Sequence, residues 1–159
     1  GQLKLVGADD SADARIVEKR MTGKAETFMR LWRERFVLAL PQRHPLAFAE
    51  QIHANDLRGI SFVSRCHCEA SSHTSGKGTQ MRTVAVVDSE EWALALVAAG
   101  VGVTILPEGS VGARPDIVVR PITSRNVSRE IGIAYGGRAS LTARGWEIIA
   151  KLKAGAARA

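Results

Sequence analysis

The segment Cys66-His67-Cys68-Glu69, followed closely by His73, gathers residue types that bind zinc or serve in nucleophilic catalysis. Along an extended strand, however, Cys66 and Cys68 face one side while His67 and Glu69 face the other. Four ligands therefore cannot converge on one ion without a bend, and a cysteine is separated from the histidine that would take its proton. We predict no metal site and no catalytic residue here, and a small enzyme using Cys66, His67 and Cys68 is kept only as an alternative.

The elements that would position functional residues are clearest after residue 82. Thr83 to Val87 is apolar and β-branched, which predicts a strand. Asp88 can cap a following helix, and Glu91 completes a capping box with it. The helix is expected to run to about Ala99, because Gly100 is placed to adopt the left-handed conformation that ends helices. Its predicted apolar side consists of Trp92, Leu96 and Val97, widened by Ala93 and Leu94.

Other elements alternate along the chain. Strands are predicted at 35–41, 60–64, 101–106, 117–122 and 130–135, a helical turn at 54–57, and a helix that Ser140 caps and that continues to Lys153. The polar, glycine-bearing segment 69–80 predicts a loop, and residues 1–30 predict a strand end followed by a loose connection. Alternating strands and helices favour parallel pairing with right-handed crossovers, so the predicted fold class is α/β with a mixed, mainly parallel sheet.

The composition indicates a folded protein with a mildly basic surface. The chain has 159 residues, of which 45% are hydrophobic, enough for one domain or two small lobes. Lys and Arg outnumber Asp and Glu by 22 to 16, giving a net charge of +6. Because these charges are scattered, they favour a small anionic ligand over a nucleic-acid-binding arm.

The cysteines and the hydropathy bear on location. Cys66 and Cys68 are too close in sequence for a disulfide that would link distant parts of the chain. Two cysteines are also too few for the disulfide framework of a small secreted protein, which favours a reducing cytoplasm. The longest nearly apolar run, Trp92 to Leu106, is shorter than the ~20 residues of a spanning helix. The start at Gly1 has neither an initiator Met nor the pattern of a secretion signal, so we interpret the chain as a fragment.

Three patterns carry a family resemblance. They are RERFVLALPQRHPLA at 33–47, DSEEWALALVAAGVGVTILPE at 88–108 and IGIAYGGRASLTARGWEIIAKL at 131–152. Together they resemble the effector-binding region of LysR-type transcriptional regulators, over roughly residues 30 to 153. The second pattern is the most specific, because helix, glycine turn, buried strand and proline stop occur in order.

The resemblance implies a periplasmic-binding-protein-like fold of type II, with a ligand cleft between two lobes. Residues 1–30 would be a remnant of the first lobe, and 31–159 the effector-binding domain. Within that domain, about 35–130 would form the second lobe and about 130–153 the returning strand and helix. Most of the first lobe and the winged helix-turn-helix are not found, so DNA would be contacted only through a head outside this chain.

The same resemblance places Ser64, Arg65 and Cys66 after a strand at the cleft, where Ser64 and Arg65 can hydrogen-bond an anionic effector. A simple exposed loop is the alternative. Ser89 lies where a helix N-terminus can bind a carboxylate, but we favour the alternative that Asp88, Glu90 and Glu91 only cap the helix.

Two further candidates have structural alternatives. Thr104 follows the glycine turn, and its hydroxyl can face the cleft or, as we favour, bond a neighbouring backbone carbonyl. Arg35 can reach a ligand carboxylate or belong to a surface ion-pair cluster with Arg33 and Glu34.

The sequence thus predicts a small-molecule-sensing domain of a LysR-type regulator, not an enzyme, without a cofactor. The expected effector is a small organic acid or an amino-acid-like molecule, and the expected assembly is a homo-oligomer with no membrane contact. A solute-binding protein of a transport system is the main alternative, since it shares the fold.

Overall fold

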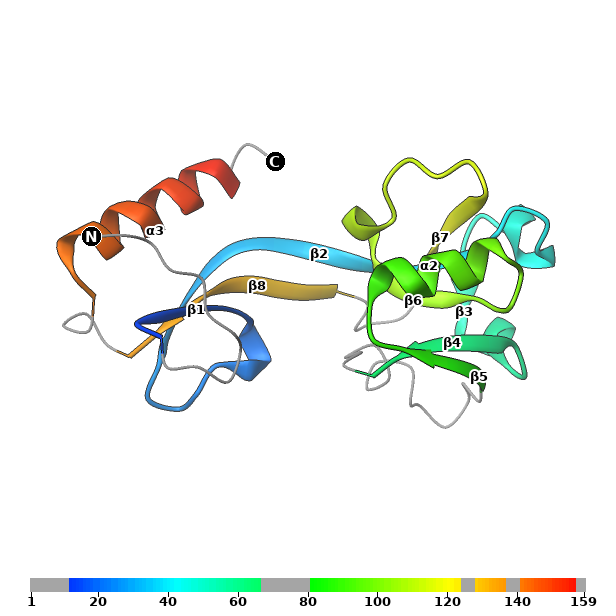
Figure 1. Cartoon of the computed structure of the whole chain (residues 1–159), viewed down its shortest axis with the longest axis horizontal. Coiled ribbons are helices and arrows are strands. Elements are labelled where there is room, and N and C mark those ends of the chain that lie inside the picture. The colour runs from blue at the N-terminus through cyan, green and yellow to red at the C-terminus, as the bar shows by residue number, and fades with distance from the viewer. Residues whose placement is uncertain (1–11, 67–80, 124–127, 137–140, 157–159) are drawn as a thin grey trace. The chain divides into compact units, whose positions relative to one another are not determined.

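The computed structural model describes residues 12–66, 81–123, 128–136 and 141–156, and Figure 1 shows the order of its elements. The strands are β1 (Ala14–Glu18), β2 (Thr27–Pro41), β3 (Ile52–His53), β4 (Ser61–Arg65), β5 (Arg82–Val87), β6 (Thr104–Pro107), β7 (Ile117–Thr123) and β8 (Ser128–Tyr135). The α-helices are α2 (Glu90–Ala98) and α3 (Ala143–Ala156), and the 3-10 helices are η1 (Lys19–Met21), η2 (Pro45–Phe48), η3 (Ala54–Leu57) and η4 (Glu108–Ser110). The predicted loop at 69–80 lies outside the described residues.

The predicted mixed α/β architecture is confirmed, but the mainly parallel pairing is not. One sheet has the order β1-β8-β2-β7-β3, with β6 also paired to β2, and β4 pairs with β5 in a second sheet. β1 with β8, β2 with β6 and β2 with β7 are antiparallel, whereas β3 with β7 and β4 with β5 are parallel. Each antiparallel pair joins strands that are not consecutive in the chain, and β6 and β7 both run opposite to β2, so the larger sheet is mixed; among the described connections an α-helix joins two strands only between β5 and β6.

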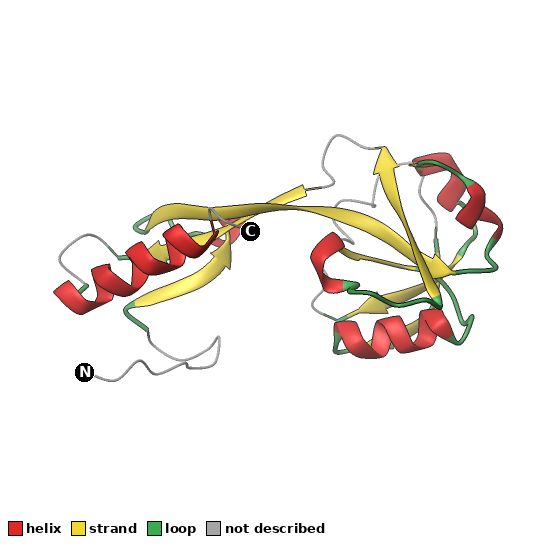
Figure 2. Ribbon diagram, turned by 90° about the horizontal axis from the view of Figure 1, so that it is seen from above, coloured by secondary structure: helices red, strands yellow, loops and turns green. Residues whose placement is uncertain are grey.

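The chain divides into two compact units. Unit 1 contains residues 1–33 and 129–159, and unit 2 contains residues 34–128. β2 therefore gives its first part to unit 1 and its second part to unit 2. Figure 2 shows α2 lying along the strands of unit 2. None of the described helices is long and apolar enough to cross a membrane.

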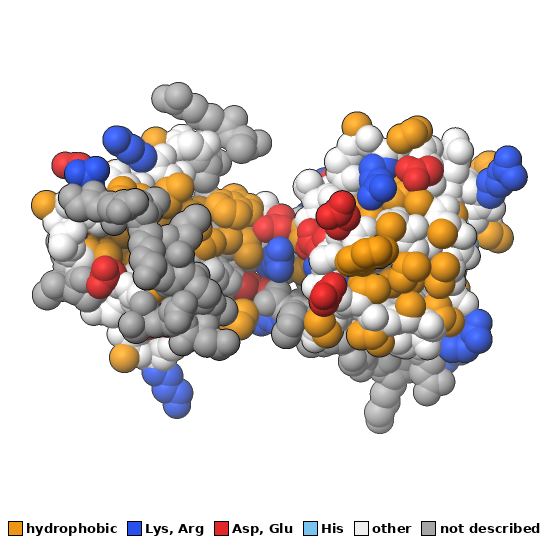
Figure 3. Space-filling model, viewed as in Figure 1, with side chains coloured by type: hydrophobic (Ala, Val, Ile, Leu, Met, Phe, Trp, Pro, Cys, Tyr) orange, Lys and Arg blue, Asp and Glu red, His pale blue; other side chains and the backbone are white. Residues whose placement is uncertain are grey.

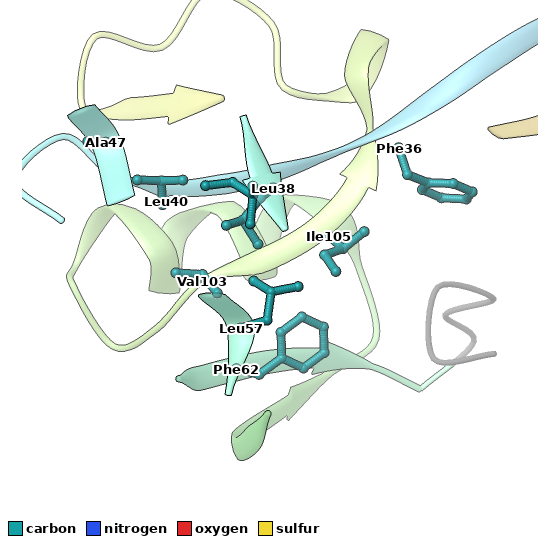
Figure 4. Packing of buried hydrophobic residues seen from close by; sticks show 9 residues of the cluster. Phe36, Leu38, Leu40, Ala47, Leu57, Phe62, Val103 and Ile105 are labelled. Carbon is teal, nitrogen blue, oxygen red and sulfur yellow. The ribbon is translucent and has the colours of Figure 1, made fainter. Parts of the chain in front are cut away.

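The core of unit 2 is built on both faces of β2, whose residues 36–40 are all buried. Because successive side chains of a strand point to opposite faces, alternate residues enter different clusters. Phe36, Leu38 and Leu40 pack with Ala47, Ile52, Leu57, Phe62, Val103 and Ile105 (Figure 4). Val37 and Ala39 pack with Leu94, Val97, Leu106, Val111 and Ile117. This double burial explains the continuous apolar run that predicted a buried strand.

The apolar side of α2 differs from the predicted one at Trp92, which is 64% exposed. Ala93, Leu94 and Val97 are the buried residues of this helix. Trp92 lies two positions before Leu94, about 200° around the helix axis, and so faces away from the core. Figure 3 shows hydrophobic atoms at the surface of unit 2 where Figure 1 places α2.

The two glycines after α2 are needed for different reasons. Gly100 has a φ of +78°, as the sequence predicted, and the Val101 N–H donates to the Leu96 carbonyl at 3.0 Å in the pattern of a Schellman motif. At Gly102 a Cβ would lie 2.6 Å from the Ser61 carbonyl oxygen. Gly102 therefore lets the start of the next strand approach β4, where the Val103 N–H donates to Ser61 at 2.9 Å.

Unit 1 corrects the prediction for residues 1–30. Instead of a loose connection, residues 14–18 form β1, which pairs antiparallel with β8, and β2 already begins at Thr27. Polar and apolar residues are mixed in these strands, so no long apolar run marks them. α3 packs against β8, the neighbour of both strands, because Tyr135 of β8 and Trp146 of α3 make an edge-to-face contact with ring centroids 5.2 Å apart.

The last helix begins later and ends later than predicted. α3 starts at Ala143, and the Thr142 Oγ1 accepts a hydrogen bond from the Gly145 N–H at 3.2 Å. Thr142 therefore supplies the capping oxygen at this end of the helix. Ser140, the predicted cap, lies outside the described residues.

Unit 1 contains an acid-sensitive ion-pair group. Hydrogen bonds from Lys19 and then from Arg30 lower the pKa of Glu130 below its ordinary 4.5, with donor–acceptor distances of 2.9 and 3.2 Å. Because the pKa is lower in the folded state, the stabilisation is complete above the ordinary pKa and is lost as the pH falls through the folded value.

We therefore expect Glu130→Gln to reduce the loss of stability between about pH 5 and about pH 2. Urea midpoints across this range measure the effect, and Glu147→Gln, at an exposed position of α3, is the control. An equally steep acid loss in both variants would show that the Glu130 pairs do not contribute.

Candidate functional site

The carboxyl ends of β4, β5 and β6 lie at one edge of unit 2. β4 runs parallel to β5, with Arg65 paired to Val87, and a parallel bridge joins Phe62 to Val103 just before β6. Ligands of open α/β sheets characteristically bind outside the carboxyl ends of parallel strands. We call this edge, with the residues that directly follow the three strands, the carboxyl edge.

Arg65 is the best-anchored polar residue of the carboxyl edge. Its Nη1 lies 2.5 Å from the Glu90 Oε1, and its side chain is only 14% exposed, against 36% for Glu90. The pair joins the end of β4 to the first residue of α2. Ser64, one residue earlier, is half-buried, and Cys66, one residue later, is exposed and donates its backbone N–H to the Val87 carbonyl at 2.9 Å.

Ser89, not Asp88, is the N-cap of α2, so the predicted cap was one residue early. Ser89 has extended backbone angles, and its Oγ accepts a hydrogen bond from the Trp92 N–H at 3.2 Å. Glu90 and Glu91 occupy the first turn, where negative charge complements the helix dipole. The acids at this helix end therefore have structural functions, as one alternative proposed.

Ser89→Ala should lower the free energy of unfolding by about 1 kcal/mol, because the Trp92 N–H loses its acceptor. Ser89→Asp keeps a capping oxygen and should remain within about 0.5 kcal/mol of the original. Urea unfolding followed by circular dichroism measures both. Equal stability of the alanine variant would mean that water replaces the cap without cost.

Thr104 has the structural role that the sequence favoured. It is 1% exposed, and its Oγ1 donates to the Val63 carbonyl at 2.9 Å. The hydroxyl proton is thus committed to tying β6 to β4, so Thr104 supports the carboxyl edge from within.

Arg35 lies at the carboxyl end of β6, because Phe36 pairs with Pro107 across β2 and β6. Its Nη2 is 3.3 Å from the Glu108 Oε2, and its side chain is 74% exposed. The structure therefore brings Arg35 to the same edge of unit 2 as Arg65, in an open surface ion pair of the kind kept as an alternative.

Sequence reasoning missed the importance of two acids, Glu90 and Glu108. Each pairs with an arginine that was predicted to bind ligand, but the partners are 25 and 73 residues apart in sequence. The only local signal for these pairs was position: Glu108 directly follows the proline that ends a predicted strand, and Glu90 lies at the predicted start of a helix. The Arg65–Glu90 pair depends on the parallel alignment of β4 with β5, and the Arg35–Glu108 pair on the antiparallel alignment of β2 with β6.

The cysteine–histidine cluster is only partly visible. Cys66 is a free, exposed thiol. His67, Cys68, Glu69 and His73 lie outside the described residues, so the predicted absence of a metal site there is untested. Elsewhere in the described part of the chain, no group of three His, Cys, Asp or Glu residues could hold a metal ion.

Unit 1 has a separate hollow of about 730 Å³, within the size range of ligand pockets. Its lining is apolar except for two cations, and it consists of Ile16, Leu31, Trp32, Arg33, Ile148, Lys151, Leu152 and Gly155. The carboxyl edge, unlike this hollow, combines a largely buried arginine with hydroxyl and thiol groups, and it is the better candidate site.

A family model described as the LysR substrate-binding domain matches residues 8–156. This chain belongs to that family. The resemblance to the effector-binding region of LysR-type transcriptional regulators is thereby confirmed, with the periplasmic-binding-protein-like fold that it implied. The family match favours a regulatory domain over both the transport and the enzyme alternatives. No curated protein matches the sequence.

Solved LysR-family structures share the fold. The oxidised form of OxyR is similar with a TM-score of 0.69 and 25% identity, over 89% of this chain and 71% of that one. The reduced OxyR regulatory domain from Pseudomonas aeruginosa gives 0.71 and 25%, over 89% and 71%. The CcmR regulatory domain from Synechocystis PCC6803, in complex with 2-PG, gives 0.75 and 18%, over 91% and 73%. This LysR domain thus shares its fold with OxyR, which has been solved in oxidised and reduced forms, and with CcmR, which has been solved with a bound ligand.

Proposed function

We propose that this LysR substrate-binding domain senses a small organic acid or amino-acid-like effector, which binds at the carboxyl edge. The observation that carries the proposal is Arg65, whose side chain is only 14% exposed and which lies at the ends of two parallel strands. Planar guanidinium groups bind carboxylates through two parallel hydrogen bonds, which gives direction as well as charge. Ser64 and Cys66 flank it, and Ser89 and Arg35 lie on the same edge.

In the protein to which this chain belongs, effector binding would shift the equilibrium between two arrangements of the regulator and so change its DNA binding through a separate head. We interpret residues 35–130 as the second lobe, 130–153 as the returning strand and helix, and 1–30 as a remnant of the first lobe. We also propose a homo-oligomer acting in the cytoplasm. Light scattering behind size exclusion tests the assembly, and a monomeric mass at every concentration would contradict it.

A thermal-shift panel of organic acids and amino acids tests the binding. A ligand present at 100 times its Kd should stabilise the fold by about 2.7 kcal/mol. Arg65→Met should abolish the shift, whereas Arg114→Met, at a surface ion pair with Asp116 elsewhere in unit 2, should preserve it. No shift across a broad panel, or an equal shift in both variants, would contradict the proposed site.

A second candidate function is a response to oxidation. Cys66 is exposed at the end of β4, Cys68 follows two residues later, and the similar OxyR structures include an oxidised and a reduced form. If this function holds, iodoacetamide should label a cysteine of the native protein faster than a free thiol at neutral pH. Peroxide should then block that labelling, and thiol-reducing agents should restore it. Slow, ordinary labelling would contradict this function.

A further inference from the structure

The guanidinium proposed to bind the effector is already in contact with a carboxylate of the same domain. The Arg65 Nη1 and the Glu90 Oε1 are 2.5 Å apart, which is a short charge-assisted hydrogen bond. From this contact we propose that Glu90 is an internal competitor of the effector: it occupies Arg65 in the free domain and must leave when an anionic group binds. This inference rests on the proposed function of the carboxyl edge.

Burial indicates which partner moves. Arg65 is 14% exposed and belongs to β4, whose pairing with β5 fixes its backbone. Glu90 is 36% exposed and is the first residue of α2, next to the Ser89 cap. Since the Glu90 side chain is the more exposed of the two, its carboxylate can swing toward water while Arg65 stays in place.

The helix does not depend on the Glu90–Arg65 contact. The Ser89 Oγ caps the Trp92 N–H, and Glu91 supplies a second negative charge in the first turn. Releasing Glu90 therefore leaves the cap and most of the dipole stabilisation intact. A carboxylate that remained beside Arg65 would repel the incoming anion, so the domain should reject weakly charged anions that cannot displace Glu90.

Affinity measurements with Glu90→Gln test the competition, and Glu91→Gln is the matched control, since it removes the same charge from the same helical turn. Isothermal titration uses the organic acids of the thermal-shift panel as probes. We expect Glu90→Gln to bind them about fivefold more tightly, which is the effect of removing one partly exposed competing ion pair. Glu91→Gln should change the affinity less than about twofold, because Glu91 has no contact with Arg65 among the described ion pairs.

Glu90→Asp is the second variant, because its shorter side chain keeps the charge and the helix start but draws the carboxylate back from Arg65. It should also bind more tightly than the original protein. If the original protein binds an acid and neither Glu90 variant binds it more tightly than Glu91→Gln does, the inference is overturned while the proposed function stands. If no variant binds any acid, the proposed function fails and the inference fails with it.

Discussion

Gly132→Ala is expected to destabilise the protein by about 3 kcal/mol, because β8 has no room for a side chain at this position. An added Cβ would lie 2.3 Å from the Met29 carbonyl oxygen and 2.5 Å from the Phe28 Cζ, both on β2. The Met29 oxygen belongs to the backbone and cannot move aside like the end of a flexible side chain. Urea unfolding followed by circular dichroism gives the difference.

Gly136→Ala is the control for this experiment. No heavy atom lies within 4 Å of the Cβ position at Gly136, one residue beyond the same strand. We expect a change within about 0.5 kcal/mol for this variant. Similar losses in both variants would mean that the cost comes from glycine conformation in general and not from the close approach of β8 to β2.

Leu38→Ala should cost about 3 kcal/mol as well, through a cavity in unit 2. Leu38 is completely buried in the cluster shown in Figure 4, between η3, β4 and β6. A strand held by partners on both sides cannot collapse into the space left by the side chain. Phe48→Ala is the control, since Phe48 is 87% exposed and its removal should change the stability by less than about 0.5 kcal/mol.

Chemical denaturation of the Leu38 and Phe48 variants, together with hydrogen exchange of the β2 amides, measures the effect. The Leu38 variant should exchange faster throughout β2, because its opening free energy falls with the global stability. Unchanged stability would show that the Leu38 cluster repacks around the smaller side chain.

The sequence predicted best those elements whose local signals agree with their packing. The β-branched residues of β5 form a strand, and serine and acidic residues begin α2. Gly100 ends that helix, and β6 stops at Pro107. Trp92 was misplaced because apolar character alone does not specify which side of a short helix is buried. Residues 14–18 and 27–33 were missed because their strand pairing is with β8, a partner that lies more than 90 residues later.

The candidate site was predicted in part for the same reason. Ser64, Arg65 and Cys66 stand out as polar residues at a strand end, which is a local property. That Arg65 is held by Glu90, that Thr104 bonds the Val63 carbonyl, and that Arg35 reaches Glu108 depends on which strands are neighbours. A pattern along one segment cannot express such contacts.

The discontinuity of unit 1 has a consequence for synthesis on the ribosome. Unit 2 is continuous from residue 34 to 128, whereas unit 1 needs both residues before 34 and residues after 128. Domains that are complete early in translation can fold while the rest of the chain is still being made. The first part of β2 must then wait until β8, residues 128–135, has left the exit tunnel. During this interval the exposed strand is open to chaperones and to other nascent chains.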